Sequence, residues 1–139
     1  MKVLLDTNVI LDHILSREPY AKNVAKIFDM ICEDKVEAVF TTNSVTDIYY
    51  IVSKRLGDTT AREALRNLFN VLVIVSIAGD DCISALNLPM TDFEDAVVAV
   101  CANKGSIDYI VSNDEEFLQV DSNIARVIPS DDLLELISS

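Results

Sequence analysis

The chain opens at residues 2–12 with the sequence KVLLDTNVILD, in which a short apolar run ends in an acid and a second apolar run follows. The first run predicts a buried strand at residues 2–5, and the second predicts a helix at residues 9–16. Asp6 then stands at the carboxyl end of the strand. Because an unpaired carboxylate is costly there, Asp6 is the first candidate for a functional residue.

The alternation of apolar strands and amphipathic helices continues along the chain. Further strands are predicted at residues 38–42, 71–76, 109–111 and 126–128, and further helices at residues 20–33, 44–56, 60–69, 80–86, 92–104 and from 130 onward. Strands that are separated by helices form right-handed crossovers and a parallel sheet covered on both faces. We therefore predict an α/β fold, a three-layer α/β/α sandwich with a central parallel sheet of about five strands.

The composition is that of a globular protein. The 139 residues suit one domain, which we expect to span residues 1–139, and half of them are hydrophobic. The apolar run before Asp6 is too short for a signal peptide, and no run approaches the length of a membrane helix. Three widely spaced cysteines argue against a disulfide framework or a zinc site. We expect a cytoplasmic protein.

Carboxylates recur where the predicted strands end. Asp6 follows the first strand, Asp47 lies one turn into the helix after the second, and Asp114 closely follows the fourth. Asp92 and Asp95 are three apart at one helix start and share a face. Ligands of parallel sheets bind outside the carboxyl ends of the strands, so we expect Asp6, Asp47, Asp95 and Asp114 to converge.

A cluster of carboxylates needs a compensating charge, and a divalent cation is the simplest one. Mg²⁺ and Mn²⁺ prefer oxygen ligands and support phosphodiester hydrolysis. Ala99 and Ala102 continue the face of Asp95 with small side chains, which suggests room for a ligand beside them. Ordinary structural roles remain open for two of the acids: Asp92 as a helix N-cap and Asp114 as part of a solvated helix start.

Three blocks of the sequence, in order, resemble the signature of the PIN-domain family of nucleases, which includes the VapC-like toxin ribonucleases. They are LLDTNVILD at residues 4–12, DAVVAVCA at residues 95–102 and YIVSNDEEF at residues 109–117. The resemblance implies that Asp6, Asp95 and Asp114 are catalytic metal ligands. Asp47 stands where the family usually has Glu, one methylene longer, and Ser112 stands where Thr is common.

The resemblance further implies a Mg²⁺- or Mn²⁺-dependent endoribonuclease that cleaves RNA. Asp47 is included in the catalytic and metal-binding set, and the residues that support it are Asn8, Asp92, Ser112 and Glu116. Many such proteins are toxins of a toxin–antitoxin pair, form homodimers and are silenced by a small antitoxin. These properties come from the resemblance and not from composition or spacing.

Two other readings compete with an active nuclease. A PIN-fold binding module that has lost its chemistry would be consistent with Asp47 in place of Glu and with the net charge of −12. A phosphotransfer enzyme of the haloacid dehalogenase type needs an acid two residues after Asp6, where this chain has Asn8. A response-regulator receiver is disfavoured because Ile128 is followed by Pro129 rather than Lys.

The charge is distributed unevenly. Residues 1–66 hold nine Lys or Arg against ten Asp or Glu, whereas residues 67–139 hold two against thirteen. Affinity for RNA comes largely from Lys and Arg at phosphates. We therefore expect RNA to approach over the helices of the first half, at Lys54, Arg55, Arg62 and Arg66. The alternative is that these cations only pair with neighbouring acids.

Overall fold

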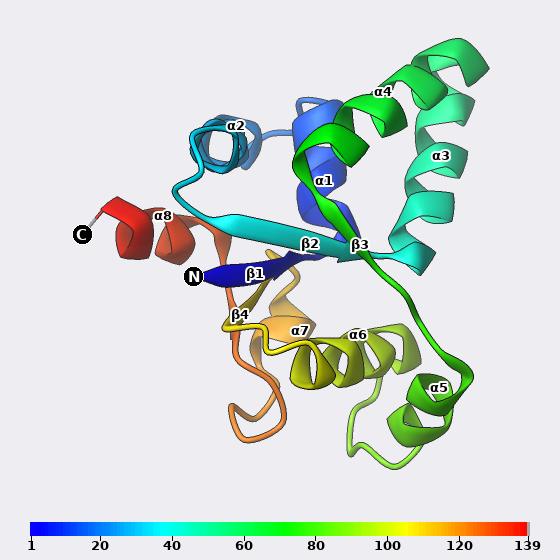
Figure 1. The fold of residues 1–139 in the computed structure, drawn as a ribbon, viewed down its shortest axis with the longest axis vertical. Coiled ribbons are helices and arrows are strands. Elements are labelled where there is room, and N and C mark those ends of the chain that lie inside the picture. Colours follow the sequence, from blue (N-terminus) through cyan, green and yellow to red (C-terminus); the bar gives the residue numbers. More distant parts are fainter. Residues whose placement is uncertain (139) are drawn as a thin grey trace.

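A computed structural model describes residues 1–138 as a sheet between two helical layers (Figure 1). The strands are β1 (Lys2–Leu5), β2 (Glu37–Thr41), β3 (Val73–Val75), β4 (Tyr109–Val111) and β5 (Val127–Ile128). The helices are α1 (Thr7–Ile14), α2 (Ala21–Cys32), α3 (Thr42–Leu56), α4 (Asp58–Val71), α5 (Gly79–Ala85), α6 (Phe93–Lys104), α7 (Glu115–Leu118) and α8 (Ser130–Ser138). The predicted α/β class and five-stranded sheet are confirmed.

All the strand pairs are parallel, in the order β3-β2-β1-β4-β5. The chain builds outward from β1 through β2 to β3, and then crosses to the other side of β1 for β4 and β5. The order of the strands therefore reverses between β1 and β4. Open parallel sheets bind ligands at the carboxyl ends of the strands beside such a switch point.

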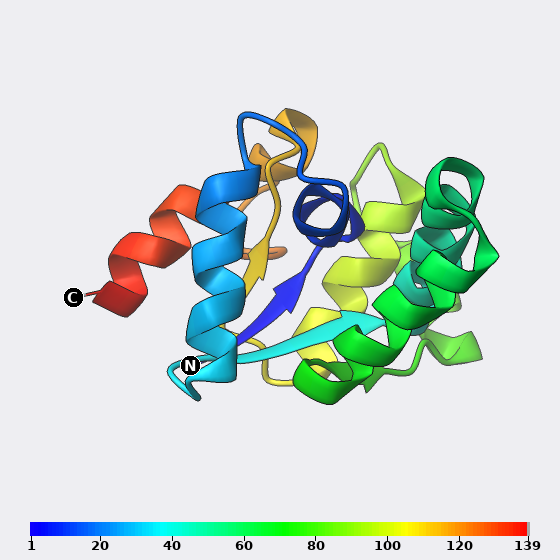
Figure 2. The ribbon, with the colours of Figure 1, turned by 90° about the horizontal axis from the view of Figure 1, so that it is seen from above.

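The alternation of side chains along β1 builds two cores. Val3 and Leu5 pack on one face with helices α1, α2, α3, α4 and α8, whereas Leu4 packs on the other face with α6 and α7. Figure 1 shows these two layers above and below the sheet, and Figure 2 shows α8 beside α2, with α3 and α4 at the other end of the same layer. Both faces of the central strands are buried, which explains their continuous apolar sequence.

Helix α6 is apolar almost all round because it lies between the sheet and α5. Ala99 and Ala102 pack against Leu4 and other residues of the sheet, while Val97 and Cys101 belong to a separate apolar cluster. Our interpretation that Ala99 and Ala102 leave room for a ligand is therefore wrong. Their small side chains let the helix approach the sheet closely.

Several predicted boundaries shift by a few residues. The side chain of Thr41 accepts a hydrogen bond from the Ser44 backbone N–H, so α3 begins at Thr42, before the predicted start at residue 44. Gly57 follows the end of this helix, with a φ of 89° that favours glycine. The short α7 was not predicted as a separate helix. No helix among residues 1–138 has the length and apolar character needed to cross a membrane.

Candidate active site

Asp6 lies at the switch point and is held there by hydrogen bonds. Its backbone N–H donates to the Val111 carbonyl at 3.0 Å, which continues the pairing of β1 with β4. One carboxylate oxygen accepts from the Thr7 backbone N–H at 2.9 Å, and the other accepts from the Ser112 hydroxyl at 2.8 Å. The Asp6 side chain thereby caps α1 and is fixed in orientation.

Burial raises the pKa of Asp6 above its ordinary value, and the charges of Asp114 and Asp92 raise it further. The hydrogen bonds from Ser112 and Thr7 act in the opposite direction because they stabilise the ionised form. Asp6 is therefore a carboxylate kept in a place that disfavours its charge.

Ser112 connects Asp6 with the loop after β4. The Ser112 side chain is fully buried, and its oxygen also accepts a hydrogen bond from the Asp114 backbone N–H at 3.1 Å. Asp114 caps α7 by accepting from the Glu116 N–H at 3.1 Å. The helix-start reading of Asp114 is thus correct, and its charge still acts on Asp6 and Asp95.

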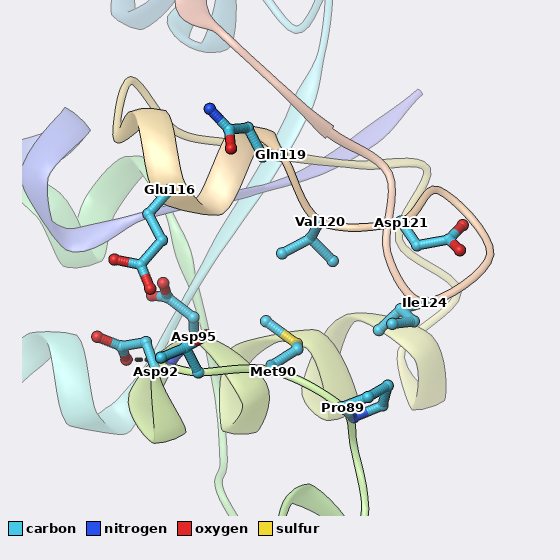
Figure 3. Close-up of a pocket in the computed structure, with 10 residues that line it drawn as sticks. Pro89, Met90, Asp92, Asp95, Glu116, Gln119, Val120, Asp121 and Ile124 are labelled. Carbon is cyan, nitrogen blue, oxygen red and sulfur yellow. Dashed lines mark hydrogen bonds between the residues drawn. The ribbon is translucent and has the colours of Figure 1, made fainter.

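Asp92 and Asp95 face a cavity of about 430 Å³ between α6 and the segment that follows α7. Figure 3 shows the carboxyl groups of Asp95 and Glu116 directed toward one another at one end of the cavity, with the Asp92 carboxyl group turned to the Asp95 backbone N–H beside them. Asp92 is also the N-cap of α6, since it accepts a hydrogen bond from the Asp95 backbone N–H at 3.0 Å. The cap reading of Asp92 therefore holds together with its place at the site.

Among the acids of the site, Asp95 has the pKa that is raised furthest above its ordinary value. Burial, followed by the charges of Asp92, Asp6, Asp114 and Glu94, raises its pKa from 3.8 to about 7. These four acids are therefore gathered around Asp95. Asp6, Asp95 and Asp114 form one electrostatic cluster, although only Asp95 among them lines the cavity.

Glu94 is a member of the cluster that the sequence analysis missed. Burial raises the pKa of Glu94, and Asp47 raises it further through its charge and a hydrogen bond between the two side chains. Asn43 at the start of α3 also donates to Glu94 at 3.2 Å. Asp47 therefore joins the site through Glu94. The position of Glu94 directly before Asp95, in the same helical turn, was the signal that could have found it.

Two further residues, Glu116 and Asn8, were predicted to support the site, and the structure places them differently. Glu116 lies at the cavity, whereas Asn8 does not face the acids, because its side chain and carbonyl accept hydrogen bonds from Arg17. Arg17 is in turn paired with the buried Asp12. The hydrogen bonds from Arg17 direct the Asn8 side chain toward the loop after α1.

The predicted RNA-binding cations all lie on the hairpin of α3 and α4. Arg62 forms an ion pair with Asp58 at 2.9 Å, and Arg66 forms one with Glu63 at 3.1 Å. Lys54 lies over the ring of Tyr50, with 4.8 Å between Nζ and the ring centroid. The alternative that these cations pair with neighbouring acids therefore holds for Arg62 and Arg66.

The acids of the site lack compensation by basic side chains. In the part of the chain that the structure describes, the ion pairs join Arg17, Lys35, Arg62, Arg66 and Lys104 to acids outside the cluster. As they are placed, no three Asp, Glu, His or Cys side chains within residues 1–138 could hold one metal ion together. Mg²⁺ commonly uses one or two carboxylates and several waters, so the oxygen donors present fit such an ion.

An open parallel α/β sheet with a crowded carboxylate cluster at its switch point defines the class of this protein. Residues 2–116 match the model of the PIN domain family, and the chain belongs to that family. It is similar to Ribonuclease VapC1 of Aquifex aeolicus (strain VF5), with 26% identity over 128 residues and 88% of each chain covered.

Solved structures share the fold at lower identity. VapBC2 from Rickettsia felis, bound to a DNA fragment from its promoter, superposes with a TM-score of 0.69 at 16% identity, covering 93% of this chain and 98% of that chain. VapC20 of Mycobacterium tuberculosis, a toxin that cleaves the Sarcin-Ricin loop, superposes with a TM-score of 0.66 at 12% identity, covering 83% and 92%. These likenesses confirm the PIN-like fold.

Proposed function

We propose that this protein is an endoribonuclease that hydrolyses RNA phosphodiester bonds with the help of Mg²⁺ or Mn²⁺. The observation that carries the proposal is the crowding of Asp6, Asp95 and Asp114 at the switch point without a basic partner. Membership of the PIN family and the similarity to a ribonuclease support it. Hydrolysis adds a water oxygen to phosphorus and breaks the bond to the leaving sugar oxygen.

In this proposal one or two carboxylates of the cluster of Asp6, Asp95 and Asp114 would hold the cation, with waters as its other ligands, and Asp47 acts through Glu94. A divalent cation held there would supply activation of water and neutralisation of charge on the phosphate. Thr7 and Ser112 keep the two oxygens of Asp6 in fixed directions, so this ligand needs little reorganisation. The ionised acids repel an anionic strand, and a cation held among them would reduce that repulsion.

The test is cleavage of single-stranded RNA by the purified protein with Mn²⁺, with Mg²⁺ and with a chelator. We expect cleavage only with metal, and we expect Asp95→Asn to abolish it. Asp132→Asn is the matched control, because Asp132 is likewise the third residue of its helix but lies exposed on α8. Cleavage that persists in chelator, or in the Asp95 variant, would refute the assignment.

A catalytically inactive binding module is the second candidate. It is favoured by the position of Asp47, which contacts Glu94 and is not among the acids whose charges act on Asp95. The two functions differ in metal binding. An active centre is stabilised by Mn²⁺ in a thermal melt, and a decayed one is not. A protein that gains no stability from Mn²⁺ and cleaves no RNA would be assigned to the binding module.

We further propose that the protein is a toxin silenced by a small antitoxin, that it forms a homodimer and that it acts in the cytoplasm. The similarity of its fold to a toxin–antitoxin complex from Klebsiella pneumoniae supports an antitoxin. Exposed Ile83 on α5 and Leu86 directly after it, with Phe93 at the start of α6, provide an apolar surface for a second copy. Growth arrest on expression, relieved by a neighbouring small gene, would test the toxin role.

A further inference from the structure

One flank of α3 leads away from the acidic cluster and carries a regular series of polar and aromatic residues. Asn43, Asp47, Tyr50 and Lys54 are spaced by four, three and four residues. At about 3.6 residues per turn, this spacing places them in one narrow stripe along the helix. The first two members contact Glu94, so the stripe starts at the site.

The other sides of α3 are occupied by the rest of the fold. Ser44, Ile48 and Val52 are buried in the core. Tyr49 faces α4, where its hydroxyl is hydrogen bonded to Asp58 and its ring lies 5.5 Å from the Arg62 guanidinium. Figure 1 shows α4 alongside α3, and the start of α3 near the sheet. The stripe of Asn43 and Tyr50 is therefore the flank that stays open to solvent.

Tyr50 has no part in the core, since 59% of its surface is exposed. The Lys54 ammonium lies 4.8 Å from the centre of its ring. An exposed aromatic ring beside a cation is the combination that proteins use for single-stranded nucleic acids, in which bases stack on the ring and phosphates meet the cation.

The cations of the α3–α4 hairpin differ in whether they pair with acids, and the two without such a pair lie on α3. Arg62 and Arg66 on α4 are engaged with acids, whereas Lys54 and Arg55 have no carboxylate within 4.0 Å in residues 1–138. In a chain of net charge −12, an anionic strand needs such a route to reach the site. Of the four cations predicted to bind RNA, Lys54 and Arg55 at the end of α3 are therefore the two available to phosphates.

We propose that Tyr50 and Lys54 form a subsite for single-stranded RNA, in which a base stacks on the Tyr50 ring and a neighbouring phosphate pairs with Lys54. The subsite rests on the proposed ribonuclease function. Lys54 is seven residues beyond Asp47, about 10 Å along the helix axis. The subsite therefore contacts the strand away from the scissile phosphate, toward the end of α3.

The experiment measures the affinity of a labelled single-stranded RNA of about twelve nucleotides by fluorescence anisotropy. The background is Asp95→Asn with Mn²⁺ present, so that the strand stays intact. We expect Tyr50→Ala to weaken binding about fivefold or more, and Tyr50→Phe to keep the affinity because stacking needs only the ring. Tyr20→Ala, at an exposed tyrosine before α2, is the matched control and should bind normally.

A second measurement isolates the phosphate contact. Lys54→Gln should lower the slope of log affinity against log salt by about 0.7, the value for one contact on a single strand. An unchanged affinity in Tyr50→Ala, or an equal loss in Tyr50→Phe, would overturn the subsite and leave the exposed ring to a protein partner. Absence of RNA binding by the parent protein would overturn it as well.

These outcomes are separable from failure of the proposed function. Tyr50-dependent binding without metal-dependent cleavage by the unmodified protein would support the subsite and refute the nuclease. Metal-dependent cleavage with the same KM in Tyr50→Ala and the unmodified protein would support the nuclease and refute the subsite. Thermal melts of each variant verify folding, which the exposure of Tyr50 should leave intact.

Discussion

Replacing Asp95 by Asn should stabilise the metal-free protein at neutral and alkaline pH, although it removes a residue of the proposed active site. The pKa of Asp95 is raised from 3.8 to about 7 by burial and by surrounding acids. Ionising Asp95 above that pH therefore costs the folded state free energy that the unfolded state does not spend. Asparagine has similar shape and carries no charge.

The magnitude follows from the pKa difference. The rise in the pKa of Asp95 corresponds to about 4 kcal/mol, at about 1.36 kcal/mol for each pKa unit. Asp95 is half-buried, and solvent screening reduces the effect to about half. The loss of an acid in the first turn of α6 opposes it by about 0.5 kcal/mol. We expect a net gain on the order of 1 to 2 kcal/mol, or roughly 5 °C in Tm for a domain of this size.

The sign of the pH dependence is fixed by the direction of the shift. A raised pKa contributes stability that is fully present below the unfolded value near 3.8 and is lost as pH rises through about 7. The advantage of the Asn variant should therefore be absent near pH 4 and reach its full value near pH 8. Urea unfolding at both pH values, with chelator present, measures it.

Asp132→Asn is the control for the helix-terminus effect, because it removes an acid from the same helical position without the crowding. It should destabilise slightly at both pH values. Added Mn²⁺ should reverse the order of stability, because only the unmodified protein retains the full ligand set. An Asp95→Asn variant that is less stable than the unmodified protein at pH 8 in chelator would refute the crowding argument.

Three further predictions concern the ligands and surfaces around this residue. Mn²⁺ at a hundred times its Kd should stabilise the protein by about 2.7 kcal/mol in a thermal melt, and a full shift in Asp6→Asn would remove Asp6 from the ligand set. Ser112→Ala should cost about 2 kcal/mol in denaturant unfolding at pH 7, because it removes a buried hydrogen bond to a carboxylate, whereas equal stability would show that the bond is dispensable. The double variant Ile83→Glu with Leu86→Glu should convert a dimer to a monomer in light scattering, and a dimer that persists would exclude this surface.

The sequence alone was sufficient for the order and type of the long elements. The apolar run of β1 is continuous because both of its faces are buried, and the apolar residues of α3 recur with the helical period of about 3.6. Both patterns are local. The acid at the end of β1 was found for the same reason. Short elements such as α7 were missed because four residues carry too little periodic signal.

Local pattern also fails where one residue type serves two environments. The small side chains of Ala99 and Ala102 are equally suited to a ligand cavity and to close packing on a sheet, and only the position of α6 decides for packing. By contrast, the ion pairs of Asp58 with Arg62 and of Glu63 with Arg66 span four and three residues of α4 and follow from local helix geometry. Charge counts along the chain do not show which cations remain free.

What the sequence determined, then, is the α/β alternation and the placement of acids after strands, because both depend on neighbours a few residues away. The tertiary structure decided how those acids meet. The strand order brings Asp6 against Ser112, 106 residues later in the chain, and the start of α3 lies close enough to the start of α6 to join Asp47 to Glu94. The pKa of Asp95 near 7 depends on burial and on charges from four other residues, of which Asp6 and Asp114 come from other elements. Such effects depend on distance in space, which spacing along the chain does not record.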